Sequence, residues 1–292
     1  MIMGIIMNSI CYECQLRRKS ALARSLGTDE QAAEFARKMM QMMLDAPEWM
    51  DSTQIGAMSE DMLREFYNVG PDRLKEEKEF SNRFAMERVD KIRGVVEQAE
   101  DPVYCALQYS VMGNYIDFSA LQGEVDFSQF DALLDSAVTL DLDKASYNRF
   151  CKELEEGKKL LYLTDNAGEI AFDRILAEEI HKKYPNVEIV FCVRGKPAYN
   201  DALREDAEAV GIPFPVIDNG SNVGGTAIHR LSEEAKNALD TADVIIAKGM
   251  GNVESMYGCG YNVYYAFLVK CERLMQVFQK EKLTPMFFPE KQ

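Results

Sequence analysis

The chain has 292 residues, of which 47% are hydrophobic, so it can bury a sizeable core and divide into two compact units. Its 48 acidic and 33 basic residues give a formal net charge of −15, which disfavours nucleic acid and anionic membrane surfaces as partners. The N-terminal apolar stretch, residues 1–7, has no basic flank and is too short to span a bilayer, so we expect a cytoplasmic protein. The seven cysteines are an odd number and mostly scattered, which indicates thiols in a reducing compartment.

The first half of the chain has helical periodicity. Apolar positions recur at helical spacing over about 14–46, 71–100, 127–137 and 143–156. Pro71 suits a first helical turn, and Asp101-Pro102 marks a break before another helix. Gly157 is a suitable C-cap just before the first apolar run. We therefore expect a helical domain over residues 1–157.

The second half alternates between short apolar runs and helical patterns. The runs are about 159–164, 187–193, 214–217, 243–247 and 263–269. Strands that alternate with helices predict a parallel sheet that is covered on both faces. We expect residues 158–292 to form a Rossmann-like α/β domain, with a doubly wound, mostly parallel sheet in three α/β/α layers. In such a sheet the ligand lies at the carboxyl ends of the strands.

Oxygen-bearing side chains follow two of these runs. The first run ends at Asp165-Asn166, and Asp201 follows the loop after the second run. Carboxylate and carbonyl oxygens suit Mg²⁺, Mn²⁺ and similar cations, whereas two histidines cannot build a His-rich metal centre. An ordinary Asp-Asn-x-Gly turn is the alternative for the first pair, and capping of a helix N-terminus is the alternative for Asp201.

A phosphate ligand would need local positive potential, because the net charge of the chain repels it. Basic residues that follow predicted strands could supply that potential together with a bound cation, and they are Arg194, Lys196, Lys248 and Lys270. Lys248 and the backbone N–H groups of two loops, which contain Ser221 and Gly249, are candidates to meet charge on phosphoryl oxygens. Solvated lysines and tight glycine turns are the alternatives.

Blocks of sequence in a fixed order also resemble a known family. They are DNAGEIAFD (165–173), RGKPAYND (194–201), DNGSNVGGT (218–226), AKGMGNVES (247–255) and VKC (269–271). These blocks resemble the metal-dependent damage-control phosphatase family, long filed as a domain of unknown function. GNYIDF (113–118) and the early Cys11-Tyr-Glu-Cys14 resemble the stand-alone prokaryotic branch of that family. The match runs from about residue 11 to residue 278.

The resemblance implies roles for particular residues. It implies Asp165, Asn166 and Asp201 as the metal ligands, and it implies that the 113–118 block closes over the active site from the helical part. Asn114 and Asp117 are three residues apart, so one face of a helix end could present both to the sheet edge, with helix capping as the alternative for Asn114. Glu169 is a candidate either to support the metal ligands or to bind substrate, although a carboxylate in a first helical turn is stabilising in itself.

Together these features predict a metal-dependent phosphomonoester hydrolase. One divalent cation, Mn²⁺, Co²⁺, Ni²⁺ or Mg²⁺, would polarise a phosphoryl oxygen and activate water for in-line attack, with Lys248 assisting. The substrates would be small phosphorylated metabolites, such as sugar phosphates or damaged phosphate esters. A phosphoaspartyl mechanism is disfavoured, because it would want a second Asp where Ala167 stands.

Two other classes stay open at this level. A nucleotide-binding transferase or dehydrogenase is one, although the first strand is not followed by G-x-G-x-x-G. A non-catalytic redox or metal-binding module built on Cys11 and Cys14 is the other. The sequence leaves open the physiological substrate, the native metal, the oligomeric state and the role of this cysteine pair.

Overall fold

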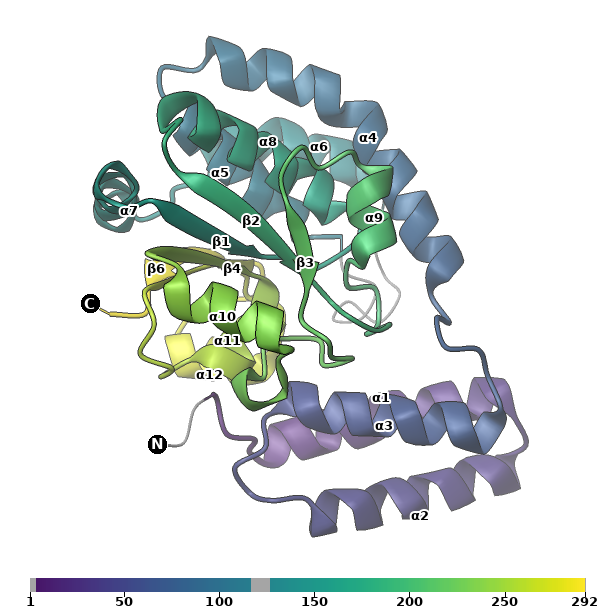
Figure 1. The fold of residues 1–292 in the computed structure, drawn as a ribbon. Coiled ribbons are helices and arrows are strands. Elements are labelled where there is room, and N and C mark those ends of the chain that lie inside the picture. Colours follow the sequence, from purple (N-terminus) through teal and green to yellow (C-terminus); the bar gives the residue numbers. More distant parts are fainter. Residues whose placement is uncertain (1–3, 117–126, 292) are drawn as a thin grey trace.

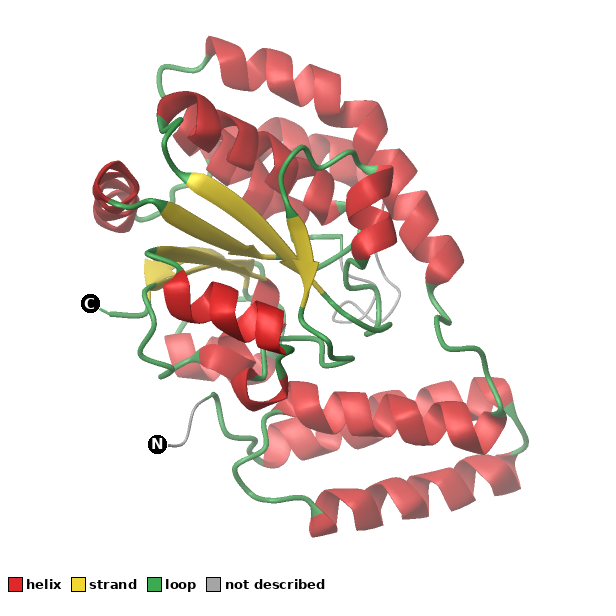
Figure 2. Cartoon of the chain, viewed as in Figure 1, coloured by secondary structure: helices red, strands yellow, loops and turns green. Residues whose placement is uncertain are grey.

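The computed structural model describes residues 4–116 and 127–291 (Figures 1 and 2). The described elements of the first part are α1 (Ser9–Leu26), α2 (Asp29–Asp45), α3 (Ser52–Tyr67), α4 (Lys75–Gln98), α5 (Pro102–Gly113), α6 (Phe127–Ser136), η1 (Ala137–Thr139) and α7 (Lys144–Glu156). They are followed by β1 (Lys159–Leu163), α8 (Glu169–Lys183), β2 (Glu188–Val193), α9 (Arg204–Ala209), β3 (Val216–Asp218), η2 (Ile228–Arg230), α10 (Glu233–Thr241), β4 (Val244–Lys248), α11 (Gly249–Met256), β5 (Val263–Leu268), α12 (Glu272–Phe278) and β6 (Pro285–Pro289). None of these helices combines the length and apolar character needed to cross a bilayer.

Within the described ranges, the strands form one sheet in the order β3-β2-β1-β4-β5-β6. Strands β1 to β5 pair in parallel, and only β6 at the edge runs antiparallel to its neighbour β5. The chain leaves β1 toward β2 and β3 on one side and returns to β4 on the other side. The order therefore reverses between β1 and β4, which is where ligands bind in open sheets of this kind. The predicted Rossmann-like fold class is confirmed.

Side chains alternate between two hydrophobic cores because successive strand residues point to opposite faces of the sheet. Leu160 and Tyr162 belong to a core shared with α4, α5 and α8, whereas Leu161 and Leu163 belong to a core shared with α10, α11 and α12. Figure 1 shows these two helical layers on opposite sides of the strands. The layers hold the carboxyl ends of the central strands in fixed positions.

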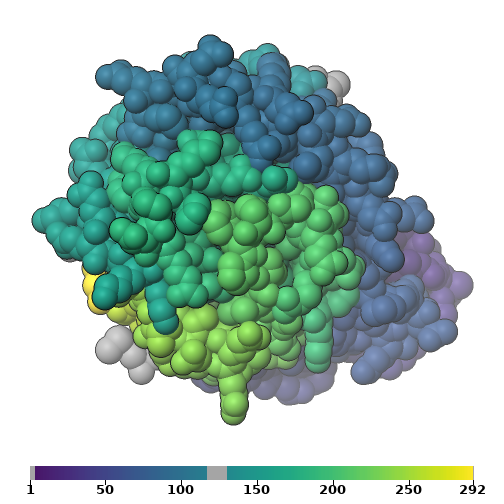
Figure 3. All heavy atoms as spheres, turned by 45° about the horizontal axis from the view of Figure 1, so that its top comes forward, coloured from purple at the N-terminus to yellow at the C-terminus, as the bar shows by residue number. Residues whose placement is uncertain are grey.

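The N-terminal helices divide into two groups. Helices α1, α2 and α3 form a core of their own around Phe35, Met39 and Leu63, and they lie apart from the sheet in Figure 1. Helices α4 and α5 pack on α8, and the blue surface of α4 lies directly against the teal and green surface of the second half (Figure 3). The change from helices to strands falls near the expected boundary at residue 157, but the cores divide the chain differently. A helical domain spanning 1–157 therefore stays a prediction.

The predicted helix limits were partly wrong. The pattern over 14–46 is two helices, because Thr28 and Gln31 form a reciprocal capping box that starts α2. Pro71 does not open a helix, since α4 begins at Lys75. The expected break at Asp101 is present, where its side chain caps α5.

Helix α3 and strand β6 were not predicted from the sequence. Helix α3 begins after Asp51, whose carboxylate accepts hydrogen bonds from two backbone N–H groups of its first turn. Strand β6 contains Pro285 and Pro289, which weaken a strand prediction but are tolerated at a sheet edge.

Candidate active site

The loops after β1 and β2 pair with each other at the carboxyl edge of the sheet. Asn166 and Asp201 form an isolated antiparallel bridge. The Ala202 N–H donates to the Asp165 carbonyl at 2.7 Å, and the Ala167 N–H donates to the Asn200 carbonyl at 2.9 Å. This backbone pairing brings the Asp201 carboxylate beside the Asp165-Asn166 pair, which is remote from it in sequence.

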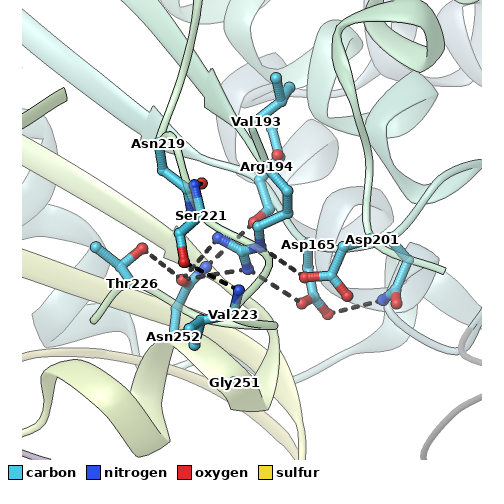
Figure 4. Close-up of polar contacts among 12 residues, drawn as sticks. Asp165, Val193, Arg194, Asp201, Asn219, Ser221, Val223, Thr226, Gly251 and Asn252 are labelled. Atoms are coloured by element: carbon cyan, nitrogen blue, oxygen red, sulfur yellow. Dashed lines mark hydrogen bonds and ion pairs between the residues drawn. The ribbon is translucent and has the colours of Figure 1, made fainter. Parts of the chain in front are cut away.

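Asp201 is held by a buried guanidinium rather than used as a helix cap. Arg194 Nε donates to Asp201 Oδ2 at 2.6 Å, and Arg194 Nη2 lies 4.0 Å from Asp165 Oδ1 (Figure 4). Helix α9 begins only at Arg204, with Leu203 as its N-cap, so the capping alternative for Asp201 does not hold. A single guanidinium thus offsets the repulsion between two carboxylates that point to one place.

Arg194 is itself held from the opposite side by Asn252 of α11, which also contacts the loop after β3. Asn252 Oδ1 accepts from Arg194 Nη2 at 3.4 Å and from Thr226 Oγ1 at 2.8 Å (Figure 4). Ser221 Oγ accepts from the Val223 N–H at 3.1 Å, so this predicted substrate-binding side chain orders its own loop in the structure. Its contact with a substrate stays a prediction.

Two asparagine amides connect Asp165 to Glu169. Asn114 Nδ2 donates to Asp165 Oδ2 at 2.9 Å and to Glu169 Oε2 at 2.8 Å, and Asn166 Nδ2 donates to the same two oxygens at 2.7 Å each. Asn114 is the C-cap residue of α5, and its Oδ1 accepts from the Leu268 N–H at 3.1 Å. Asn114 therefore ends the helix, and its side chain also reaches the sheet edge, while its contact with a substrate stays a prediction.

Asp117, the partner that we predicted for Asn114, lies outside the described residues. Glu169 is completely buried at the first turn of α8. Its carboxylate fixes the amide orientation of Asn166, which leaves Asn166 Oδ1 to accept from Asn200 Nδ2 at 2.8 Å. In the structure Glu169 therefore contacts the Asn166 amide and orients it.

Lys248 is enclosed by acidic and hydroxyl partners. Its ammonium lies 2.9 Å from Glu169 Oε1 and 3.0 Å from Asp173 Oδ1, and it donates to the carbonyl and hydroxyl oxygens of Ser110 at 2.7 and 2.8 Å. Burial alone would lower the pKa of Lys248, but the two carboxylates outweigh it and raise that pKa above its usual value. These contacts hold the Lys248 ammonium against Glu169 and Asp173. Its predicted direct contact with a phosphoryl group therefore stays a prediction.

Asp173 was not predicted as a site residue. Burial raises the pKa of its carboxyl to about 6, and the Lys248 ammonium acts in the opposite direction. Asp173 Oδ1 also accepts from Ser110 Oγ at 2.7 Å and from the Tyr162 hydroxyl at 2.8 Å. Its spacing of four residues from Glu169 on α8 was a usable signal, because that spacing puts both acids on one face of a helix.

Glycines let the α11 segment approach its neighbours closely. Gly249 has φ +75°, and a Cβ there would lie 1.9 Å from Asp165 Oδ2. A Cβ on Gly251 would lie 1.8 Å from the Gly224 carbonyl oxygen. These glycines therefore allow close packing against the site, and contact between the Gly249 segment and a phosphoryl group stays a prediction.

A cavity of about 250 Å³ opens at this edge of the sheet. Asp165, Asn166 and Asp201 all line it, whereas Arg194 and Lys248 do not. Its other lining residues are Ile10, Cys11, Glu13, Cys14, Gln15, Arg17, Arg18, Ser52, Thr53, Tyr199, Asn200, Gly224, Met250, Gly251, Glu254, Lys270, Cys271, Glu272 and Arg273. Helix α1 thus forms part of the wall, which sequence reasoning missed.

Of the predicted basic groups after the strands, Lys270 lines the cavity and Lys196 is exposed. The arginines at 17, 18 and 273 were not predicted. Arg17 and Arg18 lie one helical turn after Cys14 on α1. This helical spacing from the CxxC motif was the only sequence feature that could have indicated that the two arginines lie near the site.

The donor set at the cavity fits a hard divalent cation. Two carboxylates and one amide oxygen, from Asp165, Asp201 and Asn166, are the ligand types that Mg²⁺ and Mn²⁺ prefer. In residues 4–116 and 127–291, no three His, Cys, Asp or Glu side chains are grouped closely enough to hold a metal ion. A cation at this site would therefore need the Asn166 amide oxygen as well as the carboxylates.

The chain is similar in sequence to known proteins. Residues 7–284 match the damage-control phosphatase ARMT1-like domain. An uncharacterised protein of Methanocaldococcus jannaschii is 32% identical over 280 residues, which are 90% of this chain and 88% of that protein. A damage-control phosphatase of Archaeoglobus fulgidus is 34% identical over 205 residues, which are 69% of this chain and 70% of that protein.

The fold has a solved counterpart. The crystal structure of a DUF89 family protein from Pyrococcus horikoshii superposes with a TM-score of 0.85, covers 98% of this chain and 100% of its own, and is 24% identical. At that identity the likeness speaks for the fold alone. The sequence matches over most of the chain carry the assignment: this protein belongs to the damage-control phosphatase ARMT1-like family.

Proposed function

We propose that this protein is a metal-dependent phosphatase that hydrolyses phosphomonoesters of small metabolites, such as sugar phosphates or damaged phosphate esters. The observation that carries the proposal is that Asp165, Asn166 and Asp201 line one cavity at the edge where the strand order reverses. Membership of a phosphatase family supports the chemistry. The cavity volume of about 250 Å³ suits a small substrate.

Basic groups in the cavity wall support an anionic substrate when a cation is also bound, since Glu13, Glu254 and Glu272 line the same cavity. The chain carries a formal charge of −15, so a phosphate must be attracted locally. Lys270, Arg17, Arg18 and Arg273 line the cavity and can meet phosphoryl oxygens. Lys270 Nζ donates to the Asn114 carbonyl at 2.6 Å, which holds this ammonium near the amide that contacts Asp165.

The residues around the ligands would keep them oriented. Asp165, Asn166 and Asp201 would hold the cation, while Glu169 and Arg194 fix the Asn166 amide and the Asp201 carboxylate through direct hydrogen bonds. A bound divalent cation supplies positive charge for the phosphoryl oxygens and a water molecule of lowered pKa. The candidates are Mn²⁺, Co²⁺, Ni²⁺ and Mg²⁺.

Turnover of p-nitrophenyl phosphate tests the proposal. Purified protein should hydrolyse it slowly, lose activity in chelator, and recover activity when Mn²⁺, Co²⁺, Ni²⁺ or Mg²⁺ is returned. Asp165→Asn should abolish this activity, whereas Asp218→Asn, at the end of edge strand β3, should keep it. Full activity in excess chelator would contradict a metal-dependent mechanism.

A panel of phosphorylated metabolites, assayed by release of inorganic phosphate, would then identify the substrate class. A nucleotide-binding transferase would instead bind ATP or NAD in calorimetry and release no phosphate from simple esters. A non-catalytic cysteine module would release none from any ester with any of the four metals.

A further inference from the structure

Two thiols lie in the wall of the cavity that holds the candidate metal ligands. Cys11 and Cys14 are on the first turns of α1, and both line the cavity with Asp165 and Asp201. Cys11 is buried and Cys14 is half-buried, and neither is in a disulfide. The motif is therefore next to the site rather than on a remote surface, although it is not among the candidate ligands.

The helical spacing puts the Cβ atoms of the two cysteines slightly farther apart than a disulfide allows. Residues three apart on a helix have Cβ atoms about 5–6 Å apart. A disulfide needs a Cβ–Cβ separation of about 3.5–4.5 Å. Cys11 and Cys14 can therefore join if the start of α1 tightens by about 1–2 Å.

A third cavity thiol, Cys271, is a poorer partner. Its sulfur caps α12 by accepting from the Leu274 N–H at 3.4 Å, and it donates to Glu254 Oε1 at 3.7 Å. Burial and the Glu254 carboxylate raise the pKa of Cys271 well above its usual value, which disfavours the reactive thiolate. In the described part of the chain these cysteines do not belong to a group of three or more His, Cys, Asp or Glu side chains that could hold a metal ion.

We propose that Cys11 and Cys14 are an oxidisable pair, and that hydrogen peroxide or a related peroxide converts them to a disulfide that deforms the cavity and suppresses turnover. The suppression of turnover rests on the proposed phosphatase function of the cavity. The oxidation itself does not.

The chemistry balances with peroxide as the oxidant. Cys14, the more exposed thiol, loses its proton, and its sulfur attacks one peroxide oxygen. The O–O bond breaks, the second oxygen takes up the proton and leaves as water, and Cys14 becomes a sulfenic acid. The Cys11 sulfur then attacks the Cys14 sulfur, the S–O bond breaks, and the oxygen leaves with the Cys11 proton as a second water. Cys11 is buried and so is shielded from peroxide, which leaves it to act in the second, resolving step, although burial also raises the pKa of its thiol.

Tightening the start of α1 would move the wall of the cavity. Gln15 Nε2 donates to the carbonyl and the hydroxyl of Ser52 at 3.0 and 2.9 Å, which ties α1 to the start of α3. The Asn8 side chain caps the same turn by accepting from the Cys11 N–H at 3.3 Å. Gln15 and Ser52 both line the cavity, so a shift of this turn is transmitted to its shape.

The experiment compares oxidised and reduced protein. Wild type, Cys11→Ser/Cys14→Ser and the control Cys151→Ser are treated with hydrogen peroxide, cleared with catalase, and divided into samples with and without dithiothreitol. Cys151 is a half-buried thiol on α7, outside the cavity lining. Peptide mapping by mass spectrometry locates the disulfide, and p-nitrophenyl phosphate with Mn²⁺ measures turnover.

We expect an 11–14 linkage in wild type and Cys151→Ser, with turnover lowered about 10-fold or more and restored by dithiothreitol, since small displacements at a site are costly. The double variant should have equal turnover in both samples. The proposal is overturned if no 11–14 linkage forms, if the linkage joins Cys11 to Cys271, or if the linked protein turns over as fast as reduced protein.

A readout without turnover separates this proposal from the proposed function. Inorganic phosphate with Mn²⁺ should slow alkylation of Cys14 by iodoacetamide, because the thiol shares the cavity, and should leave alkylation of Cys151 unchanged. If reduced protein hydrolyses no ester, the proposed function fails. The linkage map still decides whether Cys11 and Cys14 are oxidisable as a pair, and the protection of Cys14 still decides whether the pair lies next to an occupied site. The absence of the linkage would overturn the first claim, and the absence of protection would overturn the second.

Discussion

The Lys248 ammonium lies 2.9 Å from Glu169 Oε1, and neither side chain is exposed to solvent. Replacing this lysine should therefore be costly, because it leaves Glu169 and Asp173 buried without their counter-charge. Lys248→Met should lower the free energy of unfolding by about 3–5 kcal/mol in urea denaturation. Lys236→Met, which removes an exposed lysine paired with Asp240, is the control and should cost about 0.3–0.5 kcal/mol. Equal losses in the two variants would contradict the inferred role of the buried pair.

Activity and metal affinity should fall together in Lys248→Met. We expect kcat/KM to decrease by about 10²–10³, comparable to the loss of one donor that stabilises transition-state charge. Calorimetry should show weaker Mn²⁺ binding too, because Glu169 would no longer be held where it orients the Asn166 amide. Unchanged Mn²⁺ affinity with the same kinetic loss would favour a direct contact between Lys248 and the phosphoryl group.

Asp201→Ala should abolish turnover and also destabilise the protein. Two converging carboxylates alone suggest that removing one relieves repulsion, but Arg194 reverses this expectation. Its guanidinium is buried and bonded to Asp201 at 2.6 Å, so the variant leaves a buried charge without that partner. Thermal unfolding without metal should show a loss of about 3–5 kcal/mol, and calorimetry should show strongly weakened Mn²⁺ binding.

Asp218→Ala is the matched control for that variant, because Asp218 pairs with Arg204 at the surface. It should retain wild-type Mn²⁺ affinity and lose about 0–1 kcal/mol of stability. Wild-type Mn²⁺ affinity in Asp201→Ala would show that Asp201 is not a ligand.

Stability should depend on pH through Asp173. Burial raises the pKa of its carboxyl from 3.8 to about 6, so the folded protein binds this proton more tightly than the unfolded chain does. The resulting stabilisation is fully present below 3.8 and is lost as pH rises through about 6. Asp173→Asn cannot titrate, so the Tm of wild type minus that of the variant should decrease from about pH 4 to about pH 7.

Asp240→Asn is the control for this titration, because the pKa of the Asp240 carboxyl is shifted in the opposite direction. The hydrogen bond from Lys236 lowers the pKa of the exposed Asp240 carboxyl. The difference in Tm between wild type and Asp240→Asn should therefore not decrease over the same rise in pH. A constant difference for Asp173→Asn would mean that this carboxyl does not titrate in the folded protein within that range.

Gly249→Ala should disturb the site through the backbone. The residue has φ +75°, which costs roughly 1–2 kcal/mol for an L-residue. Its Cβ would also overlap Asp165 Oδ2, so the carboxylate must move and Mn²⁺ binding should weaken. Gly70→Ala is the control, because nothing lies within 4 Å of its Cβ position. Unfolding and calorimetry measure both effects, and equal behaviour of the two variants would contradict the close approach.

The fold could be predicted from the sequence because its signal is local. Apolar runs such as 159–164 and 243–247 alternate with helical patterns, and the structure has β1 and β4 there. The prediction failed for β6, because its prolines disfavour a strand while its position at the edge of the sheet allows one. The proline-containing β6 pairs with β5, where Phe288 lies opposite Tyr265, and no local pattern reveals this pairing.

The candidate site could be predicted only in part. Asp165 and Asn166 are adjacent, and strand-end logic placed Asp201 at the same edge, in agreement with the family resemblance. The enclosure of Lys248 by Glu169 and Asp173 was not predictable. A position at the end of a strand fixes the place of the Cα atom, but it does not fix the direction in which a long side chain extends.

The sequence by itself determined the class of fold, the edge of the sheet that carries polar groups and the oxygen character of the candidate ligands. These follow from periodicity and residue type, which act within a few neighbours along the chain. Tertiary structure alone decided that α1 walls the cavity with Cys11 and Cys14, and that Arg194 lies between two carboxylates. Those relationships arise when segments far apart in sequence pack together, and packing depends on the whole core rather than on any local pattern.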